Sequence, residues 1–439
     1  MTACTKHWRS ACGKAASRSP APVRRPRPGL PRLSFLAFFL LIAAAPSAAV
    51  PIPASLPQSA GRAHANKGFD HFYNLELDEA VAAYQKAIEL EPENPDFWIG
   101  LAHARMFQHL RSAGKLDAQI YTASNDLLPR LKPADQQFER DMWKSLERAR
   151  KLCEKRLAAN KQDVEAHYAL GMAYAVEANF HINARGKPLD ALRPATRAKN
   201  HHARVREFAP GNHDVNLVLG TYEYVIGSVP AGFRWVLWLV GYTGSKQRGI
   251  ELLKGAVING KRVAPPAMAT MAYVYNREQQ YGASRQMLEH LVNFYPRNSV
   301  FPMEIGASYA REGNFTAAAN AYAEVARKFE SGAAGFAQMS APRLYFQLAV
   351  MREYSGDHKQ ASAEYDKALS AFQGANGHSS PSANPAEPLA RLRATVLLRF
   401  GSISASLGEK EKARWLLEQA AATPFAEVKR SATERLKKL

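Results

Sequence analysis

The chain has 439 residues, of which 46% are hydrophobic and 22% are charged, and its formal net charge is +19 at pH 7. This length is sufficient for a large core or an array of repeats, and the composition is ordinary for a soluble protein. It excludes a mainly disordered chain and a membrane protein with many spans.

Residues 1–49 are organised like a secretory signal peptide. They contain eight basic residues and no acidic residue, then an apolar run over residues 35–45, then Ser47, Ala48 and Ala49. A basic region, a short apolar region and small residues at a cleavage site define such a peptide, and the apolar run is short for a membrane span. We expect export to the periplasm or cell envelope with cleavage near Ala49. An uncleaved anchor and an over-extended start are the alternatives.

Cleavage would remove eight positive charges and lower the formal net charge from +19 to +11. It would also remove Cys4 and Cys12, so the mature chain would keep only Cys153 and could form no intramolecular disulfide. We expect Cys153 to be a packing residue. A charge of +11 is compatible with anionic partners or a membrane surface, although it is more often only a soluble surface.

Helical periodicity begins after a flexible lead-in over residues 50–60. A helix pair is expected over residues 61–94, and its second helix, residues 77–91, is amphipathic because Ala80, Tyr84 and Ala87 recur on one face. A polar stretch over residues 111–135 interrupts the next pair. Helices are then expected over residues 136–159, from Val164 onward, and up to Pro210.

Residues 216–255 depart most from this pattern, because they contain an apolar insertion at 226–245 with Trp235 and Trp238. The apolar run is far shorter than the ~20 residues that span a bilayer. The favoured interpretation is a helix-loop insertion folded inside the array with both Trp rings buried. The alternative is an interfacial membrane contact with both rings exposed.

Residues 265–326 contain a 34-residue period. Ala272, Tyr275 and Ser284 are followed 34 residues later by Gly306, Tyr309 and Ala318, and Pro296 ends the first unit. Small residues allow close helix crossing, and aromatic residues fill the space between neighbouring pairs. This stretch resembles the tetratricopeptide repeat (TPR) superfamily. The resemblance implies an all-α fold, a superhelical α-solenoid of antiparallel helix pairs with inserted loops. We divide it into arrays at 61–260 and 261–439.

The apolar insertion resembles a particular branch of that superfamily, the inclusion-body-clearance and tetratricopeptide-repeat-39-like family. The residues that match its pattern of glycines and apolar residues are Gly241, Tyr242, Gly244, Gly249, Ile250 and Leu253. The resemblance implies a non-enzymatic adaptor fold, in that family often associated with membranes or protein quality control. The predicted signal peptide departs from this cytosolic family, so its biology is not carried over.

The remaining residues continue the array. A Gly- and Ala-rich insertion over residues 329–341 precedes another repeat that begins at Pro342. A linker over residues 374–388 is rich in Gly, Ser, Asn and Pro and is longer than typical connections. The last pair covers residues 389–422, and the charged tail that follows is typical of a solvated capping helix.

The sequence contains no convincing catalytic, cofactor or metal site. His201 and His202 are adjacent and would point about 100 degrees apart on a helix, and His64 and His71 have no acidic or Cys companion at ligand spacing. Residues 241–246 lack the glycine spacing of a phosphate loop, so a turn with Thr243 or Ser245 capping the next helix is expected. Basic residues are mixed with acidic ones, which argues against nucleic-acid binding.

We therefore predict a protein- or peptide-binding adaptor or assembly protein of the cell envelope, without enzymatic activity. The alternatives are a small-molecule-binding component of an envelope transport system, in which Trp235 and Trp238 close a pocket, and a peripheral membrane protein. The repeat register places the partner-binding candidates on the concave side of the first helices, and we expect about half of them to pack in the core instead. The candidates are Phe69, Tyr73, His103, Phe107, Tyr168, Tyr224, Tyr273, Asn276, Arg277, Arg311, Arg343 and Tyr354.

Overall fold

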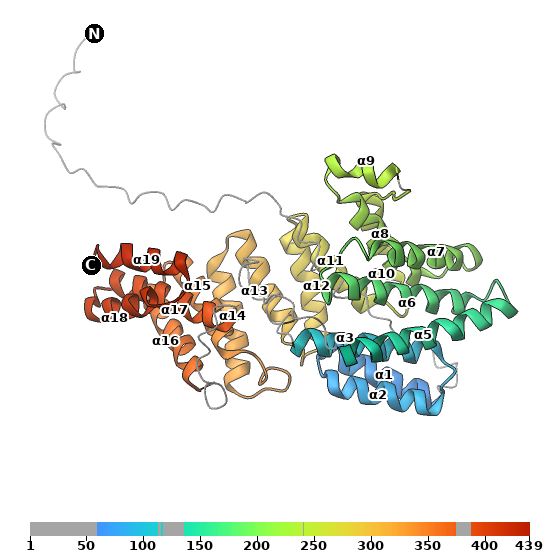
Figure 1. Ribbon diagram of the computed structural model, residues 1–439, viewed down its shortest axis with the longest axis horizontal. Coiled ribbons are helices and arrows are strands. Elements are labelled where there is room, and N and C mark those ends of the chain that lie inside the picture. Colours follow the sequence, from blue (N-terminus) through green and yellow to red (C-terminus); the bar gives the residue numbers. More distant parts are fainter. Residues whose placement is uncertain (1–58, 113–115, 117–135, 240, 375–387) are drawn as a thin grey trace, which may run out of the picture. The chain divides into compact units, whose positions relative to one another are not determined.

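The computed structural model describes residues 59–112, 116, 136–239, 241–374 and 388–439 (Figure 1). Within these residues every regular element is a helix, which confirms the predicted all-α class. The predicted signal peptide, nearly all of the lead-in and most of the stretches 111–135 and 374–388 lie outside the described residues. The described residues belong to one compact unit.

The helices of the first half follow one another in pairs along the chain. They are α1 (Ala60–Tyr73), α2 (Leu77–Leu90), α3 (Pro95–Ser112), α5 (Gln136–Ala159), α6 (Val164–Asn183), α7 (Leu192–Phe208), the 3₁₀ turn η3 (His213–Val215), α8 (Asn216–Gly227), α9 (Ala231–Leu239) and α10 (Lys246–Asn259). The predicted bounds of α5 are confirmed, and α2 ends one residue before the predicted end.

The second half continues the same arrangement to the end of the chain. Its helices are α11 (Ala264–Arg277), α12 (Tyr281–Phe294), α13 (Val300–Glu312), α14 (Phe315–Glu330), α15 (Ala341–Tyr354), α16 (His358–Gly374), α17 (Pro388–Ser406), α18 (Lys410–Ala421) and α19 (Ala426–Leu436). The two helices of each pair pack on each other, the second helix packs on the next pair, and α19 covers α18 as the expected capping helix. This stacking is the solenoid that the 34-residue period predicts.

Local signals in the sequence explain where several helices begin. The side chains of Ser59, Asp163, Ser245 and Asn314 accept the backbone N–H three residues later, at the starts of α1, α6, α10 and α14. Such caps satisfy N–H groups that have no partner inside the helix. The prediction that Thr243 or Ser245 caps the helix after residue 244 is confirmed for Ser245.

Tyrosines that pack on glycines set the spacing between neighbouring helices. The ring of Tyr84 lies between Gly68 on α1 and Gly100 on α3, and a Cβ atom at Gly100 would lie 2.4 Å from Tyr84 Cε1. The same contact recurs between Gly306 on α13 and Tyr322 on α14, also at 2.4 Å. Any larger residue would displace the ring, which explains why small and aromatic residues alternate at one-repeat spacing.

The buried side chains form two hydrophobic clusters. The first extends from Ala65 to Phe301, and the second extends from Met303 to Ala432. The predicted division at 260/261 therefore falls inside the first cluster. The physical reason is that α10 and α11 pack directly on each other, so the core continues across that position.

Candidate functional site

Six of the twelve predicted partner-binding residues are buried. Each is at most 4% exposed, and they lie on α1, α3, α6 and α8: Phe69, Tyr73, His103, Phe107, Tyr168 and Tyr224. Their aromatic rings fill the space between neighbouring helices. For example, the ring centroids of Phe72 on α1 and Phe107 on α3 are 4.8 Å apart. The prediction of a partner surface is wrong for these six, because other parts of the fold cover them.

The other six predicted residues lie on the first helices of three consecutive pairs. They are Tyr273, Asn276 and Arg277 on α11, Arg311 on α13, and Arg343 and Tyr354 on α15. Arg277 and Arg311 are both exposed and are separated by one repeat. Arg311 Nη1 lies 3.3 Å from Glu304 Oε2, and the Arg399 guanidinium lies 5.2 Å from the centre of the Tyr354 ring. The structure therefore provides a partly exposed surface of Tyr, Asn and Arg residues.

The Trp235 and Trp238 side chains on α9 are 60% and 66% exposed. The favoured sequence interpretation, in which both rings are buried inside the array, is wrong. The reason is that α9 follows the turn after α8 and no described helix packs extensively on it. At these exposures neither ring is enclosed, whereas the small-molecule alternative required both rings to close a pocket.

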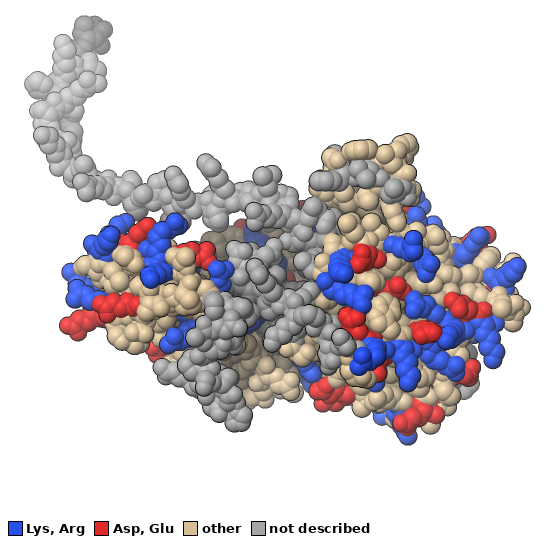
Figure 2. All heavy atoms as spheres, in the orientation of Figure 1, with Lys and Arg blue, Asp and Glu red and all other residues tan. Residues whose placement is uncertain are grey.

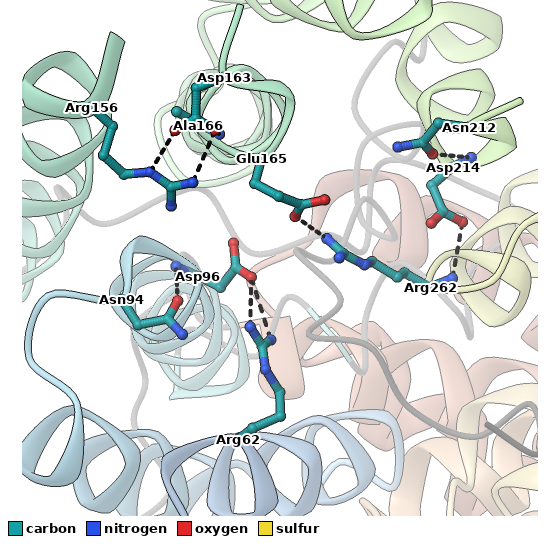
Figure 3. Close-up of polar contacts among 10 residues, drawn as sticks. All are labelled: Arg62, Asn94, Asp96, Arg156, Asp163, Glu165, Ala166, Asn212, Asp214 and Arg262. Carbon is teal, nitrogen blue, oxygen red and sulfur yellow. Dashed lines mark hydrogen bonds and ion pairs between the residues drawn. The ribbon is translucent and has the colours of Figure 1, made fainter. Parts of the chain in front are cut away.

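The starts of several helices meet in a polar cluster that the sequence analysis did not identify (Figure 3). Arg62 on α1 pairs with Asp96 on α3, with Nη2 and Oδ2 3.2 Å apart. Arg156 on α5 contacts both carboxylate oxygens of Asp163, each at 2.9 Å. Burial alone would raise the pKa of Asp163, but the hydrogen bonds from Arg156 and the Ala166 N–H lower it overall.

The same cluster connects helices that are distant in the sequence. Arg262, in the connection between α10 and α11, donates from Nη1 to Glu165 Oε2 on α6 at 2.8 Å. Asp214 accepts the backbone N–H groups of Lys261 and Arg262 at 2.7 and 2.9 Å. Burial tends to lower the pKa of Arg262, but nearby carboxylates, first of all Glu165, raise it overall, so its charge is retained. These contacts hold the α10–α11 connection against α6 and η3.

A pocket of about 500 Å³ opens beside this cluster, and its lining includes Arg62, Glu91, Glu93, Asp96 and Glu165. Each of the four carboxylates already has a protein partner: Glu91 accepts the Gly61 N–H, and Glu93, Asp96 and Glu165 pair with arginines. The charges of these carboxylates are thus already compensated inside the protein. The arrangement joins repeats to one another, including repeats that are distant in the sequence.

Two further pockets of about 440 Å³ are also lined largely by charged and polar side chains. One lies beside Trp143 and Arg185, and the other lies beside Trp98 and Arg105. Neither includes Trp235 or Trp238. These three pockets are not the deep apolar cavity that the small-molecule alternative required.

The helices on either side of α9 cross at contact distance. A Cβ atom at Gly249 on α10 would lie 2.5 Å from the Tyr224 backbone nitrogen, and one at Gly220 on α8 would lie 2.9 Å from the Gly249 carbonyl oxygen. Gly241 has a φ angle of +84°, which favours glycine. The glycines on which the family resemblance rests therefore have structural roles in the crossing and the turn.

The sequence matches the family described as Iml2/Tetratricopeptide repeat protein 39 over residues 134–372, which is more than half of the chain. The chain belongs to this family. Residues 76–106 also match a TPR repeat. Both resemblances inferred from the sequence are thereby confirmed.

Solved structures similar to this Iml2/TPR39-family protein include the human IFIT1 dimer with m7Gppp-AAAA. That structure is 15% identical, with a TM-score of 0.36, and the match covers 88% of this chain and 82% of that one. A monomeric IFIT1 mutant with Gppp-AAAA is 14% identical, with a TM-score of 0.36, covering 87% of this chain and 81% of that one. A search of the curated proteins found no match.

TPR proteins are generally non-catalytic scaffolds. In this family member Cys153 is buried, as expected for a packing residue, and burial raises the pKa of its thiol to about 12. Across the described ranges, no group of three or more His, Cys, Asp or Glu side chains could hold a metal ion.

His201 and His202 point to different neighbours. His201 Nδ1 lies 3.0 Å from His167 Nδ1. The buried His202 ring makes a T-shaped contact with the Tyr168 ring, with centroids 5.1 Å apart.

None of the described helices has the length and hydrophobicity needed to cross a bilayer.

One signal in the sequence would have located part of the polar cluster. Arg62 and Asp96 are 34 residues apart, and so are His167 and His201. Residues one repeat apart occupy equivalent positions on neighbouring pairs, so a complementary pair at this spacing predicts a contact. The Glu165–Arg262 pair spans 97 residues and has no such signal.

Proposed function

We propose that this Iml2/TPR39-family protein is a non-enzymatic adaptor that binds another protein or a peptide segment in the cell envelope. The observation that carries the proposal is the surface of Tyr273, Asn276, Arg277, Arg311, Arg343 and Tyr354 on α11, α13 and α15. Tyr and Arg are enriched in protein interfaces, because they combine a large contact area with hydrogen bonding. Three consecutive repeats present them at positions that the register assigns to the concave side.

The location in the envelope is supported by residues 1–49, with their basic, apolar and small-residue regions. Its test is independent of the binding surface. The protein is recovered from cell fractions, and its amino terminus is sequenced. We expect a mature chain that begins near Val50 in the envelope fraction. A cytosolic chain that retains Met1 would contradict this part of the proposal.

The binding surface is tested with Arg277→Ala/Arg311→Ala in the mature chain. Partners are captured from an envelope extract and quantified by mass spectrometry. We expect this variant to lose the principal partner, because two exposed arginine residues are removed from the surface. The matched control is Arg414→Ala/Arg430→Ala, which removes two exposed arginines from α18 and α19 and should retain that partner. If both variants retain every partner, the surface is assigned wrongly.

A further inference from the structure

The helix α9 has an apolar face that no other described helix covers. Trp235, Trp238 and Leu239 are 60%, 66% and 63% exposed. They occupy positions i, i+3 and i+4, which lie on one side of a helix. Three large apolar side chains on one exposed face are unusual for a surface that meets only water.

The position of α9 separates it from the packed array. Its neighbours in the chain, α8 and α10, pack closely on each other, while α9 stands beyond them (Figure 1). The backbones of α8 and α10 approach closely at Gly220 and Gly249, so these two helices pack on each other and not on α9. The apolar face is therefore held away from the core by the fold.

The segment around α9 carries slightly more basic than acidic residues. Residues 223–251 contain Arg234, Lys246 and Arg248, and the two acidic residues are Glu223 on α8 and Glu251 on α10. Arg248 is exposed, whereas Lys246 pairs with Glu278 at 2.6 Å. In Figure 2 the described atoms of α9 form a tan projection, and both basic and acidic side chains lie on the neighbouring surface. This combination is complementary to an apolar layer beneath negative charges.

We propose that α9 is an interfacial helix that inserts Trp235, Trp238 and Leu239 into the headgroup region of an anionic lipid membrane. Indole rings favour this region because they have both an apolar body and an N–H donor. The nine residues of α9 are too few to span a bilayer, so the helix lies in the interface. A projecting helix also fits a lipid surface without a complementary pocket. This interaction is additional to the proposed binding of a protein.

The test is flotation of the mature chain with vesicles of phosphatidylcholine, with and without phosphatidylglycerol. We expect the chain to float with the anionic vesicles and much less with the neutral ones. Trp235→Ala/Trp238→Ala should lower the partition coefficient about tenfold or more, because two large apolar contacts with lipid are lost. Arg248→Gln should lower it by about fivefold on anionic vesicles and leave neutral vesicles unaffected.

The matched control is Trp415→Ala, because Trp415 is 54% exposed but lies on α18. It should float like the unchanged chain. Quenching of tryptophan fluorescence by brominated lipid provides a measurement that needs no variant, and we expect quenching only with anionic vesicles. Equal flotation of the α9 variant and the unchanged chain would overturn the proposal, as would failure of the unchanged chain to bind anionic vesicles. Loss of a captured protein partner in the α9 variant, without loss of flotation, would assign α9 to protein docking instead.

Discussion

Arg297 Nε donates to Glu76 Oε1 at 2.6 Å, although the two residues are 221 positions apart in the sequence. Arg297 lies in the connection between α12 and α13, and Glu76 lies in the turn between α1 and α2. Beside this pair, Tyr295 stacks on Tyr73 with ring centroids 5.0 Å apart, and the Asn298 side chain donates to the Tyr73 carbonyl oxygen at 2.5 Å. The first helix pair is thus attached directly to the α12–α13 connection.

In this attachment we expect Asn298→Ala to destabilise the protein more than Arg297→Ala. Asn298 is 4% exposed, and its Oδ1 atom also accepts the Val300 N–H at the start of α13. Losing these two hydrogen bonds of a buried side chain costs about 1–3 kcal/mol. Arg297 is more exposed, so water and salt screen its ion pairs, and about 1 kcal/mol or less is expected. Urea unfolding measures both, and an equal or reversed order would show that the ion pairs dominate the attachment.

The close crossing of α8 and α10 predicts that Gly249→Ala is destabilising. The new methyl group would lie 2.5 Å from the Tyr224 nitrogen and 2.7 Å from the Gly220 oxygen, both of which are backbone atoms. Separating the helices costs about 1–3 kcal/mol, which exceeds the gain in helix propensity. Gly282→Ala on α12 is the control, because nothing lies within 4 Å of its Cβ position. Gly282→Ala should stabilise the protein by up to about 1 kcal/mol. Equal thermal unfolding midpoints for the two variants would contradict this explanation.

Buried histidines predict a loss of stability in acid. Burial lowers the pKa of His202 from 6.5 to about 3, and the neighbouring His201 has a smaller effect in the same direction. The pKa of His201 is lowered to about 4, first by burial and then by His167. The folded state then binds fewer protons than the unfolded state, so stability is complete above about pH 6.5 and decreases as the pH falls toward these values. Each such group contributes a slope of at most about 1.4 kcal/mol per pH unit.

The measurement is the free energy of unfolding in urea from pH 7 down to pH 5. His202→Phe should be less stable at neutral pH, because it alters a packed site, but it should lose less stability on acidification. His290→Gln changes an exposed residue on α12 and should keep the dependence of the unchanged chain. If His202→Phe retains the full slope, another group is responsible for the sensitivity to acid.

The Arg62–Asp96 pair predicts a measurable coupling between neighbouring repeats. The two side chains are 24% and 17% exposed, and Arg62 also lies 5.1 Å from the centre of the Phe97 ring. A double-mutant cycle with alanine should give about 0.5–1.5 kcal/mol. The more exposed pair Lys86–Glu89, within α2, should give less than about 0.5 kcal/mol. If the coupling free energy of Arg62–Asp96 is no larger than that of Lys86–Glu89, the pair does not help to join the two repeats.

The sequence by itself determined the helix pairs, their order and the family. These features depend on contacts between residues close in the chain, which recur at one-repeat spacing. The packing of Tyr322 on Gly306 and the caps at Asp163 and Ser245 are of this kind. A small residue opposite an aromatic residue has few other ways to pack, so the pattern specifies the structure.

Only the tertiary structure decided which side chains are covered. The sequence pattern is the same for an aromatic residue in the core and for one on the surface, so it did not separate the buried Tyr224 from the exposed Tyr354, nor show that Trp235 is exposed. Burial depends on whether another helix packs over the position. The Arg297–Glu76 pair has the same origin, because its residues come together only when many repeats have stacked, and no local pattern specifies that distance.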